Sequence, residues 1–225
     1  MYNSYRLVFT IRFLGYFLLI SGLYSLFFIF GPIISAEFNY RADRVLGIKH
    51  TIPDIVTSKT KNEIVEVQKE ASDEGSSIIP VSTEYGIVIE KINANAKIIP
   101  NIDAANEKEY TKALSEGVVE ALGSTPPGQP GNLYLFSHST DAPWNIIRYN
   151  AIFYLLRELE VGDRVIIFYK NRRYDYLVFD KTVAQANDIS FLTNKYDEPV
   201  LTLQTCDPPG TLLHRLIIRA KLVKK

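Results

Sequence analysis

An all-β barrel or sandwich behind an apolar N-terminal helix is the architecture that this 225-residue sequence predicts. From position 78 onward, short runs rich in β-branched and aromatic residues alternate with clusters of turn residues, which is typical of a barrel or a sandwich. The helical patterns in this region are few and short. Phe13–Ile34, in contrast, carries no charge and is long enough to cross a bilayer, which takes about 20 apolar residues.

The apolar run sets the N-terminus apart from the rest of the chain. A secretory signal peptide has a shorter apolar region of roughly 7–15 residues before its cleavage site, although Ser35–Ala36 leaves cleavage open. A buried core helix is the other alternative, but this helix would be apolar all round and lies at the extreme N-terminus of the sequence. We therefore expect a membrane anchor within residues 1–36, with residues 13–34 in the bilayer. The basic residues that flank the run do not decide its orientation.

Residues 37–77 are expected to connect the anchor to the folded domain. Ala36–Gly47 has the pattern of a helical extension, whereas His50–Ser77 is polar and charged. Because such a composition buries little surface, it indicates a stalk, with Asn62–Glu70 as a candidate for a short helix. The folded domain then covers residues 78–225.

Strands are predicted wherever apolar and β-branched residues cluster between turn signals. They are Tyr85–Ile92, Ala96–Ile99, Gly117–Ala121, Asn132–Phe136, Arg164–Tyr169, Arg173–Val183, Val200–Thr205 and Arg215–Val223. Helices are expected at Glu107–Leu114, capped by Asn106, and at Asn150–Leu156. Ser124–Gly131 reads as a loop, and a hairpin turn is expected near Asn171.

Charge and cysteine content argue against several classes of function. The 25 basic residues balance 25 acidic ones, so nothing indicates an electrostatic grip on nucleic acid. A single cysteine forms neither an internal disulfide nor a thiolate zinc site. The three histidines lie far apart in the sequence, without metal-ligand spacing. We therefore expect no cofactor and no metal.

The single cysteine, Cys206, directly follows the predicted strand Val200–Thr205. A lone cysteine in a strand most often packs as a small hydrophobe. Three features favour a nucleophile instead. A strand end is where functional groups meet loops, an unused thiol is a liability outside the cytoplasm, and basic residues follow that could stabilise a thiolate.

Arg215 is the basic residue that we expect beside Cys206. Alternation along the next strand places Arg215 and Arg219 on one face and His214 on the other. Arg219 lies farther along, roughly 13 Å beyond Arg215. We therefore interpret Arg219 as a charge at the rim.

His138 is the expected proton donor and acceptor. It ends a buried strand, LYLFSH, from which its ring can point toward the end of another strand. A histidine that only caps the loop is the alternative. If Arg215 faces the site, His214 points away from it, and His50 lies in the stalk.

Several motifs of the chain are shared with one known family. Two of these motifs contain the proposed site residues. Cys206 and Arg215 lie in TLQTC and the following HRLIIRA, and His138 lies in ALSEGVVEALGSTPPGQPGNLYLFSHS. YGIVIEKINANAKIIPNID and RYNAIFYLLRELEVGDRVIIFY lie in the same domain. Together they resemble the sortases, membrane-anchored cysteine transpeptidases with a TLxTC…R signature, over about residues 78–223. The chain departs from the pattern at Ser137, where many members have glycine before the histidine.

The resemblance implies an eight-stranded β-barrel with Cys206 as nucleophile, His138 as general acid and Arg215 as the group that stabilises the oxyanion or the substrate. The implied reaction cleaves an LPxTG-like Thr–Gly bond of a C-terminal sorting signal and forms a thioacyl-enzyme. Transfer to an amine follows, with His138 protonating the leaving amine and deprotonating the incoming one.

The resemblance also implies the surroundings of the enzyme. Its partners would be surface proteins that carry sorting signals and an amine acceptor of cell-wall or pilin type. It would sit in the cell membrane with a single span and an extracellular catalytic domain. Thr205, Leu203 and Trp144 are expected to bind substrate, although Trp144 also fits a role in packing its loop against the barrel.

Two other functions remain open from the sequence. One is a thiol hydrolase of the same fold, in which water resolves the acyl-enzyme. The other is a membrane-anchored β-domain that binds a partner without chemistry, against which the combination of Cys206, His138 and Arg215 argues. Acidic residues near Asp188 and Asp197–Glu198 suggest a calcium site, as in some sortases, but surface acids are usually only solvated.

Overall fold

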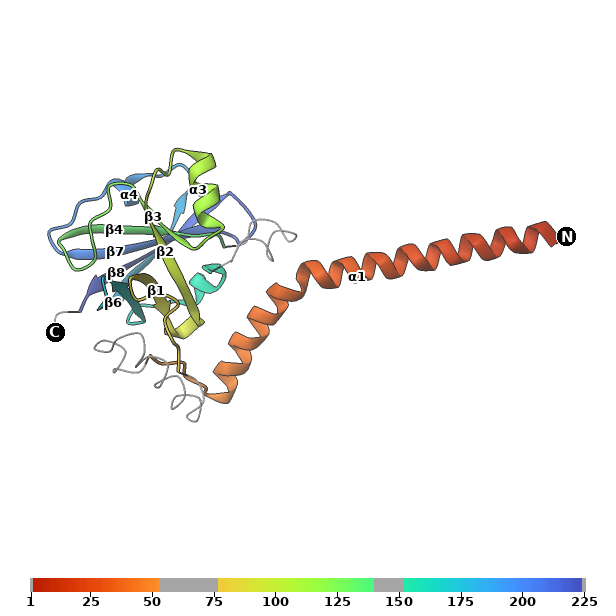
Figure 1. Ribbon diagram of the computed structural model, residues 1–225, viewed down its shortest axis with the longest axis horizontal. Helices are drawn as coiled ribbons and strands as arrows, with labels where there is room; N and C mark the ends of the chain where they lie inside the picture. The colour runs from red at the N-terminus through yellow and green to blue at the C-terminus, as the bar shows by residue number, and fades with distance from the viewer. Residues whose placement is uncertain (1, 53–76, 140–151, 224–225) are drawn as a thin grey trace.

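Residues 2–52, 77–139 and 152–223 are described by the computed structural model, and they contain eight strands (Figure 1). The strands are β1 (Tyr85–Ile89), β2 (Ala94–Ile102), β3 (Val118–Ala121), β4 (Gly131–Phe136), β5 (Arg164–Tyr169), β6 (Arg172–Gln185), β7 (Pro199–Asp207) and β8 (His214–Leu222). They close into one barrel in the order β1–β2–β3–β4–β7–β8–β6–β5, with β5 paired to β1. The pairs β2–β3 and β4–β7 are parallel and the others are antiparallel. The predicted all-β barrel is confirmed.

Local chemistry explains most of the element boundaries. Helix α3 (Glu107–Leu114) begins where the Asn106 side chain accepts a hydrogen bond from the Glu109 amide, as predicted. The β5–β6 hairpin turns through Lys170 and Asn171, which both have positive φ. This pair of dihedrals is the one that a two-residue type I′ hairpin requires.

Two predicted elements differ from the structure. The strand expected over Tyr85–Ile92 stops at Ile89, because η2 (Glu90–Ile92) turns the chain and ends at Asn93 in the left-handed region. The helix expected over Asn150–Leu156 is instead a short 3₁₀ helix, η3 (Tyr154–Glu158). Residues 150–151 of that prediction lie outside the described part of the chain.

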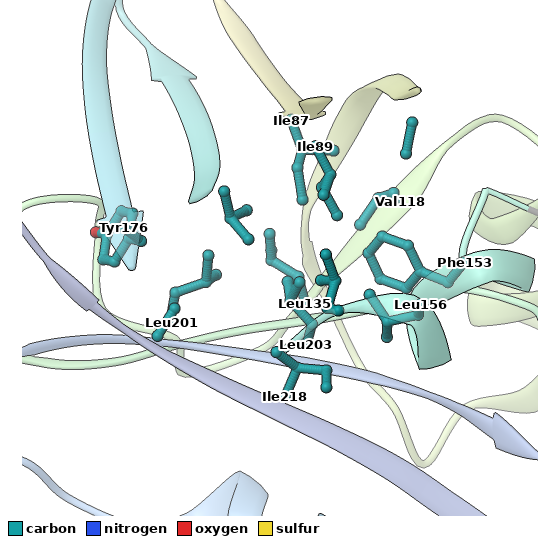
Figure 2. Packing of buried hydrophobic residues seen from close by; sticks show 14 of the residues in the cluster. Ile87, Ile89, Val118, Leu135, Phe153, Leu156, Tyr176, Leu201, Leu203 and Ile218 are labelled. Carbon is teal, nitrogen blue, oxygen red and sulfur yellow. The ribbon is translucent and has the colours of Figure 1, made fainter. Parts of the chain in front are cut away.

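The barrel interior is filled by side chains from alternate positions of every strand (Figure 2). Each fully buried Leu or Ile contributes about 1.5–3 kcal/mol of transfer free energy. Phe153 and Leu156, next to and within η3, close one end of this core. On β7, Leu201 and Leu203 belong to the core, so period-two alternation turns Gln204 and Cys206 to the outer face.

Further clusters cover the outside of the barrel. Ala113 and Leu114 of α3 pack on Val119, with Tyr110 and Phe136 beside them. On the other side, Ile52 and Ile78 pack on β1 and β5. The predicted stalk therefore has barrel-bound ends, and its candidate helix at positions 62–70 lies outside the described residues.

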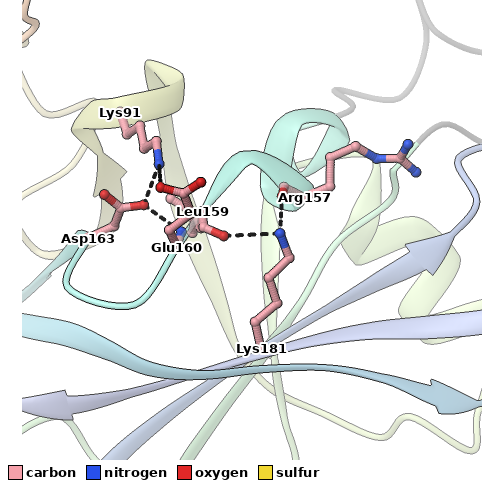
Figure 3. Close-up of polar contacts among 6 residues, drawn as sticks. All are labelled: Lys91, Arg157, Leu159, Glu160, Asp163 and Lys181. Atoms are coloured by element: carbon pink, nitrogen blue, oxygen red, sulfur yellow. Dashed lines mark hydrogen bonds and ion pairs between the residues drawn. The ribbon is translucent and has the colours of Figure 1, made fainter.

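Salt bridges and hydrogen bonds hold η3 and the following turn against the barrel (Figure 3). Lys91 of η2 lies 2.8 Å from Asp163 and 3.4 Å from Glu160. Lys181 of β6 donates to the carbonyl oxygens of Leu159 (3.1 Å) and Arg157. The Arg157 guanidinium also lies 2.8 Å from Asp207, so η3 braces the end of β7 beside Cys206.

Helix α1 (Tyr2–Leu46) includes both the apolar run and the predicted helical extension. Its segment of membrane-spanning length and composition is Tyr5–Phe28, with no part buried in the protein. This segment starts earlier than the predicted Phe13–Ile34. The helix ends at Leu46 and is followed by Gly47, whose φ of 69° is the left-handed conformation that commonly terminates helices.

Candidate functional site

Cys206 and Arg215 are cross-strand partners in the antiparallel pair of β7 and β8. Directly opposed residues in such a pair have Cβ atoms about 4.5–5.5 Å apart on the same face. Leu216 and Ile218 point into the core, which turns Arg215 and Arg219 outward with Cys206. The predicted adjacency of the thiol and a guanidinium therefore follows from strand register.

His138 comes to the same place from β4, which lies parallel to β7. It stands two residues beyond the end of β4 and lines, with Cys206 and Arg215, a pocket of about 510 Å³. His214 is not among the residues that line this pocket. The structure thus brings together three predicted groups, from β7, from β8 and from the segment that follows β4.

Arg215 and Arg219 share a face but have different surroundings. Arg215 Nη1 donates to the carbonyl oxygens of His214 (3.1 Å) and Leu212 (3.4 Å), which holds the guanidinium at the pocket. Arg219 donates to Asp180 (3.0 Å) and to the Tyr196 hydroxyl (3.3 Å). Arg219 also lies over the rings of Phe179 and Phe191, 5.3 and 5.7 Å from their centroids, so its contacts are structural.

The residues expected to bind substrate lie in different environments. Thr205 lines the pocket, and its hydroxyl donates to the Ser137 carbonyl oxygen at 2.9 Å, which ties β7 to the end of β4. Leu203 has no exposed surface and belongs to the barrel core, which leaves it no direct contact with a substrate. Trp144 lies outside the described residues.

Sequence reasoning missed several residues of the pocket wall. Tyr134 and Phe136 of β4 line the pocket, as does Gln204, which accepts a hydrogen bond from the Tyr134 hydroxyl. Burial raises the pKa of Tyr134, opposed by the charge of Arg215, so the phenol stays a donor at neutral pH. The sequence could have identified Tyr134 and Phe136, because they stand four and two residues before His138 and so point to the same face of an extended chain.

The loop between β6 and β7 forms another part of the wall. It contains α4 (Ser190–Thr193) and is held down by buried amide contacts. Asn132 Nδ2 donates to the Phe191 carbonyl oxygen at 2.9 Å, and the Thr202 hydroxyl donates to Asn132 Oδ1 at 2.8 Å. Ile189 and Leu192 thereby stand at the pocket.

Two of the acids considered for calcium, Asp188 and Glu198, serve other contacts. Asp188 accepts from the Ser190 amide at 2.9 Å, and hydrogen bonds from Ser190 hold the pKa of this carboxyl below its usual value. Glu198 lies 2.6 Å from Lys221. Among the residues that the structure describes, no group of three or more His, Cys, Asp and Glu side chains is arranged to hold a metal.

This set of groups suits acyl transfer. A thiol supplies the nucleophile, an imidazole can donate and accept the proton, and a guanidinium can stabilise negative charge on a carbonyl oxygen. The pocket lining includes apolar side chains such as Leu114 and Leu192, which can bind apolar side chains of a peptide.

Comparison with known proteins agrees with this reading. The family model for the sortase domain matches residues 87–223, more than half of the chain. No curated protein matches the sequence significantly.

Several solved sortase structures share this fold at low sequence identity. Sortase C-1 from Actinomyces oris is 24% identical with a TM-score of 0.54, covering 71% of this chain and 83% of that one. Sortase D5 from Clostridium perfringens is 24% identical with a TM-score of 0.51 and coverages of 71% and 89%. A lid mutant of sortase A from Corynebacterium diphtheriae is 22% identical with a TM-score of 0.52 and coverages of 85% and 93%. At these identities the likeness concerns the fold.

Proposed function

Because the chain belongs to the sortase family, we propose that it is a membrane-anchored cysteine transpeptidase that acts through Cys206, His138 and Arg215. The observation that carries this proposal is the pairing of Cys206 with Arg215 across β7 and β8, with His138 on the wall of the same pocket. A binding domain without chemistry would need none of these three groups in one place.

The first step forms a thioester between substrate and enzyme. The Cys206 sulfur attacks the carbonyl carbon of the scissile peptide bond, and a tetrahedral oxyanion forms. As the C–N bond breaks, His138 gives its proton to the leaving amine. In the second step an acceptor amine attacks the thioester, His138 takes the proton from that amine, and the thiolate leaves with the new amide bond complete.

Arg215 acts on the oxyanion in both steps. Its guanidinium is held by the carbonyl oxygens of Leu212, in the β7–β8 connection, and of His214, the first residue of β8, and is therefore oriented before substrate arrives. A preorganised donor of this kind is worth about 10²–10³ in rate. Thr205 supports the geometry by tying the cysteine strand to the residue before His138.

The proposed substrates are surface proteins with a C-terminal sorting signal, and the acceptor is an amine of the cell wall or of a pilin. The N-terminal apolar helix supports anchoring in the cell membrane. We propose a single span, with residues 78–225 as the catalytic domain outside the cell. Residues 1–36 would form the anchor and residues 37–77 the link to it.

Trapping of the acyl-enzyme tests the chemistry. The full chain in detergent is incubated with peptides of the LPxTG type, and intact mass is measured after acid quench. Wild type should gain the mass of the acyl fragment, and Cys206→Ala should not. An adduct that persists in Cys206→Ala would exclude this cysteine as the nucleophile.

Amine competition separates transpeptidase from hydrolase. With rising concentrations of a triglycine or lysine-containing acceptor, the amide product should grow at the expense of the free acid. If only the acid forms at all acceptor concentrations, the enzyme is a thiol hydrolase.

A further inference from the structure

The part of α1 next to the barrel, residues 34–46, uses one face to hold the barrel. Tyr40 packs against the barrel core, and Asp43 lies 2.9 Å from His50. Ala36, Tyr40 and Asp43 line a cavity of about 660 Å³ between this part of the helix and the barrel. Spacings of three and four residues place them on one face of the helix.

The opposite face of the same segment is apolar and exposed. The exposed fractions are 63% for Ile34, 68% for Phe38 and 86% for Val45. Phe38 stands two residues from Ala36 and from Tyr40, which is about 200° around a helix of 3.6 residues per turn. Ile34 and Val45 fall on that side as well. The segment therefore has two distinct faces. One face packs against the barrel, and the opposite face is apolar and exposed.

This exposed apolar face lies close in the chain to the segment that is long enough to span a membrane. The segment of membrane-spanning length, Tyr5–Phe28, precedes it in the same helix. Figure 1 shows α1 bending as it nears the barrel, so the two parts are not collinear. Arg41 lies about 60° from Phe38 around the helix and is paired with Glu37 at 2.6 Å, whereas Arg44 lines the cavity on the barrel side. A long basic side chain at the position of Arg41 can reach lipid headgroups while its stem covers apolar surface.

We propose that residues 34–46 form an interfacial helix whose Ile34, Phe38 and Val45 insert into the boundary between headgroups and acyl chains. Exposed apolar surface of this kind would otherwise remain in water. The helix then links bilayer and barrel directly, with lipid on one face and Tyr40 and the barrel on the other. The pocket lined by Cys206 and His138 is thereby held in one orientation relative to the membrane surface. This proposal rests on the membrane anchoring proposed above, and not on the peptide chemistry.

Site-specific labelling of the full chain tests the proposal. Cys206 is the only cysteine, so a Cys206→Ala background allows one environment-sensitive NBD label at Phe38→Cys or at Val45→Cys. Each variant is reconstituted into nanodiscs of phosphatidylcholine and phosphatidylglycerol, with and without doxyl-labelled lipid. We expect blue-shifted emission and quenching of about twofold or more at both positions, because the labels enter the interface.

Two control positions make the result unambiguous. Val161 is an exposed valine on the barrel (70%), and a label at Val161→Cys should show water-like emission and no lipid quenching. Leu19 lies within the segment of spanning length, and a label there reports anchoring itself.

Quenching at Leu19→Cys without quenching at positions 38 and 45 would overturn the interfacial helix and leave the anchor intact. Absence of quenching at Leu19→Cys would overturn both. Blue-shifted emission at positions 38 and 45 that needs no lipid, together with disulfide cross-linking between copies of the same cysteine variants left unlabelled, would mean that a second chain covers this face and would also overturn the proposal.

Discussion

Cys206 of β7 and Arg215 of β8 lie directly opposite each other in an antiparallel ladder. Their separation is therefore set by backbone pairing and not by a flexible loop. The next pairs along the two strands, Gln204 with Ile217 and Thr202 with Arg219, keep the same face. Arg219 therefore lies on the same face as the thiol but four residues farther along β8 than Arg215. We expect substitutions of the two arginines to have different effects on activity and stability.

Replacing Arg215 should reduce the rate of acylation with little effect on folding. Arg215→Lys keeps the charge but loses the planar fork of donors, and we expect a fall of about 10²–10³ in single-turnover acylation. The measurement is the rate of acyl-adduct formation on the full chain. A rate within a few-fold of wild type, at unchanged thermal midpoint, would remove Arg215 from the mechanism.

Replacing Arg219 should lower the stability of the fold with little effect on the rate of acylation. Arg219→Lys removes contacts to Phe179, Phe191, Tyr196 and Asp180, and each cation–π contact is worth about 0.5–2 kcal/mol. Thermal unfolding of the detergent-solubilised chain should show a lower midpoint. The acylation rate, measured well below that midpoint, should stay within a few-fold of wild type, and a loss comparable with that of Arg215→Lys would contradict this assignment.

His138 and His214 form a second matched pair. His138→Ala should lower steady-state peptide turnover by about 10²–10⁴, the usual contribution of a general acid and base. His214→Ala should retain most of the activity, because His214 does not line the pocket. Equal losses in the two variants would mean that the proton comes from elsewhere.

The two arginines also show how far sequence reasoning reaches. Alternation on one strand separated Arg215 from His214, because the side-chain period of a strand is a local property. The partners of Arg219 come from β6, at Phe179, and from the β6–β7 loop, at Phe191 and Tyr196. Such partners depend on strand order around the barrel, which a single sequence does not display.

Strand parity explains one more difference. Leu203 and Cys206 stand three positions apart in the motif, so they point to opposite faces of β7. Leu203 packs in the core while Cys206 lines the pocket. Membership in a motif was therefore a weaker guide to substrate contact than parity, which would also have identified Tyr134 and Phe136.

A partly buried carboxyl on β3, that of Glu120, predicts a pH-dependent stability. Glu120 accepts a hydrogen bond from the Tyr85 hydroxyl at 2.7 Å, and burial raises the pKa of Glu120 above its usual value of 4.5. The fold therefore favours the protonated carboxyl, so this group stabilises the fold most below that value and less as the pH rises through its folded pKa.

The matching experiment is Glu120→Gln, which removes the cost of the buried charge. Its free energy of unfolding relative to wild type should be near zero at about pH 4 and become positive by about pH 7. Glu116→Gln is the control, because Glu116 is half exposed and lies 3.4 Å from Lys97. A gain for Glu120→Gln that does not change with pH would show that packing and not ionisation is responsible.

Two buried hydroxyls beside the site predict stability changes of opposite sign. The Ser137 hydroxyl is buried and has no hydrogen-bond partner among the described residues, whereas the Thr202 hydroxyl donates to Asn132 at 2.8 Å. An unsatisfied buried polar group costs about 1–3 kcal/mol. Ser137→Ala should therefore raise the free energy of unfolding by up to that amount.

Thr202→Val should lower the free energy of unfolding by a similar amount, because Asn132 Oδ1 loses its donor. Denaturant titration of both variants measures the two effects, and a loss of stability in Ser137→Ala would show that this hydroxyl is satisfied in solution, for example by an ordered water.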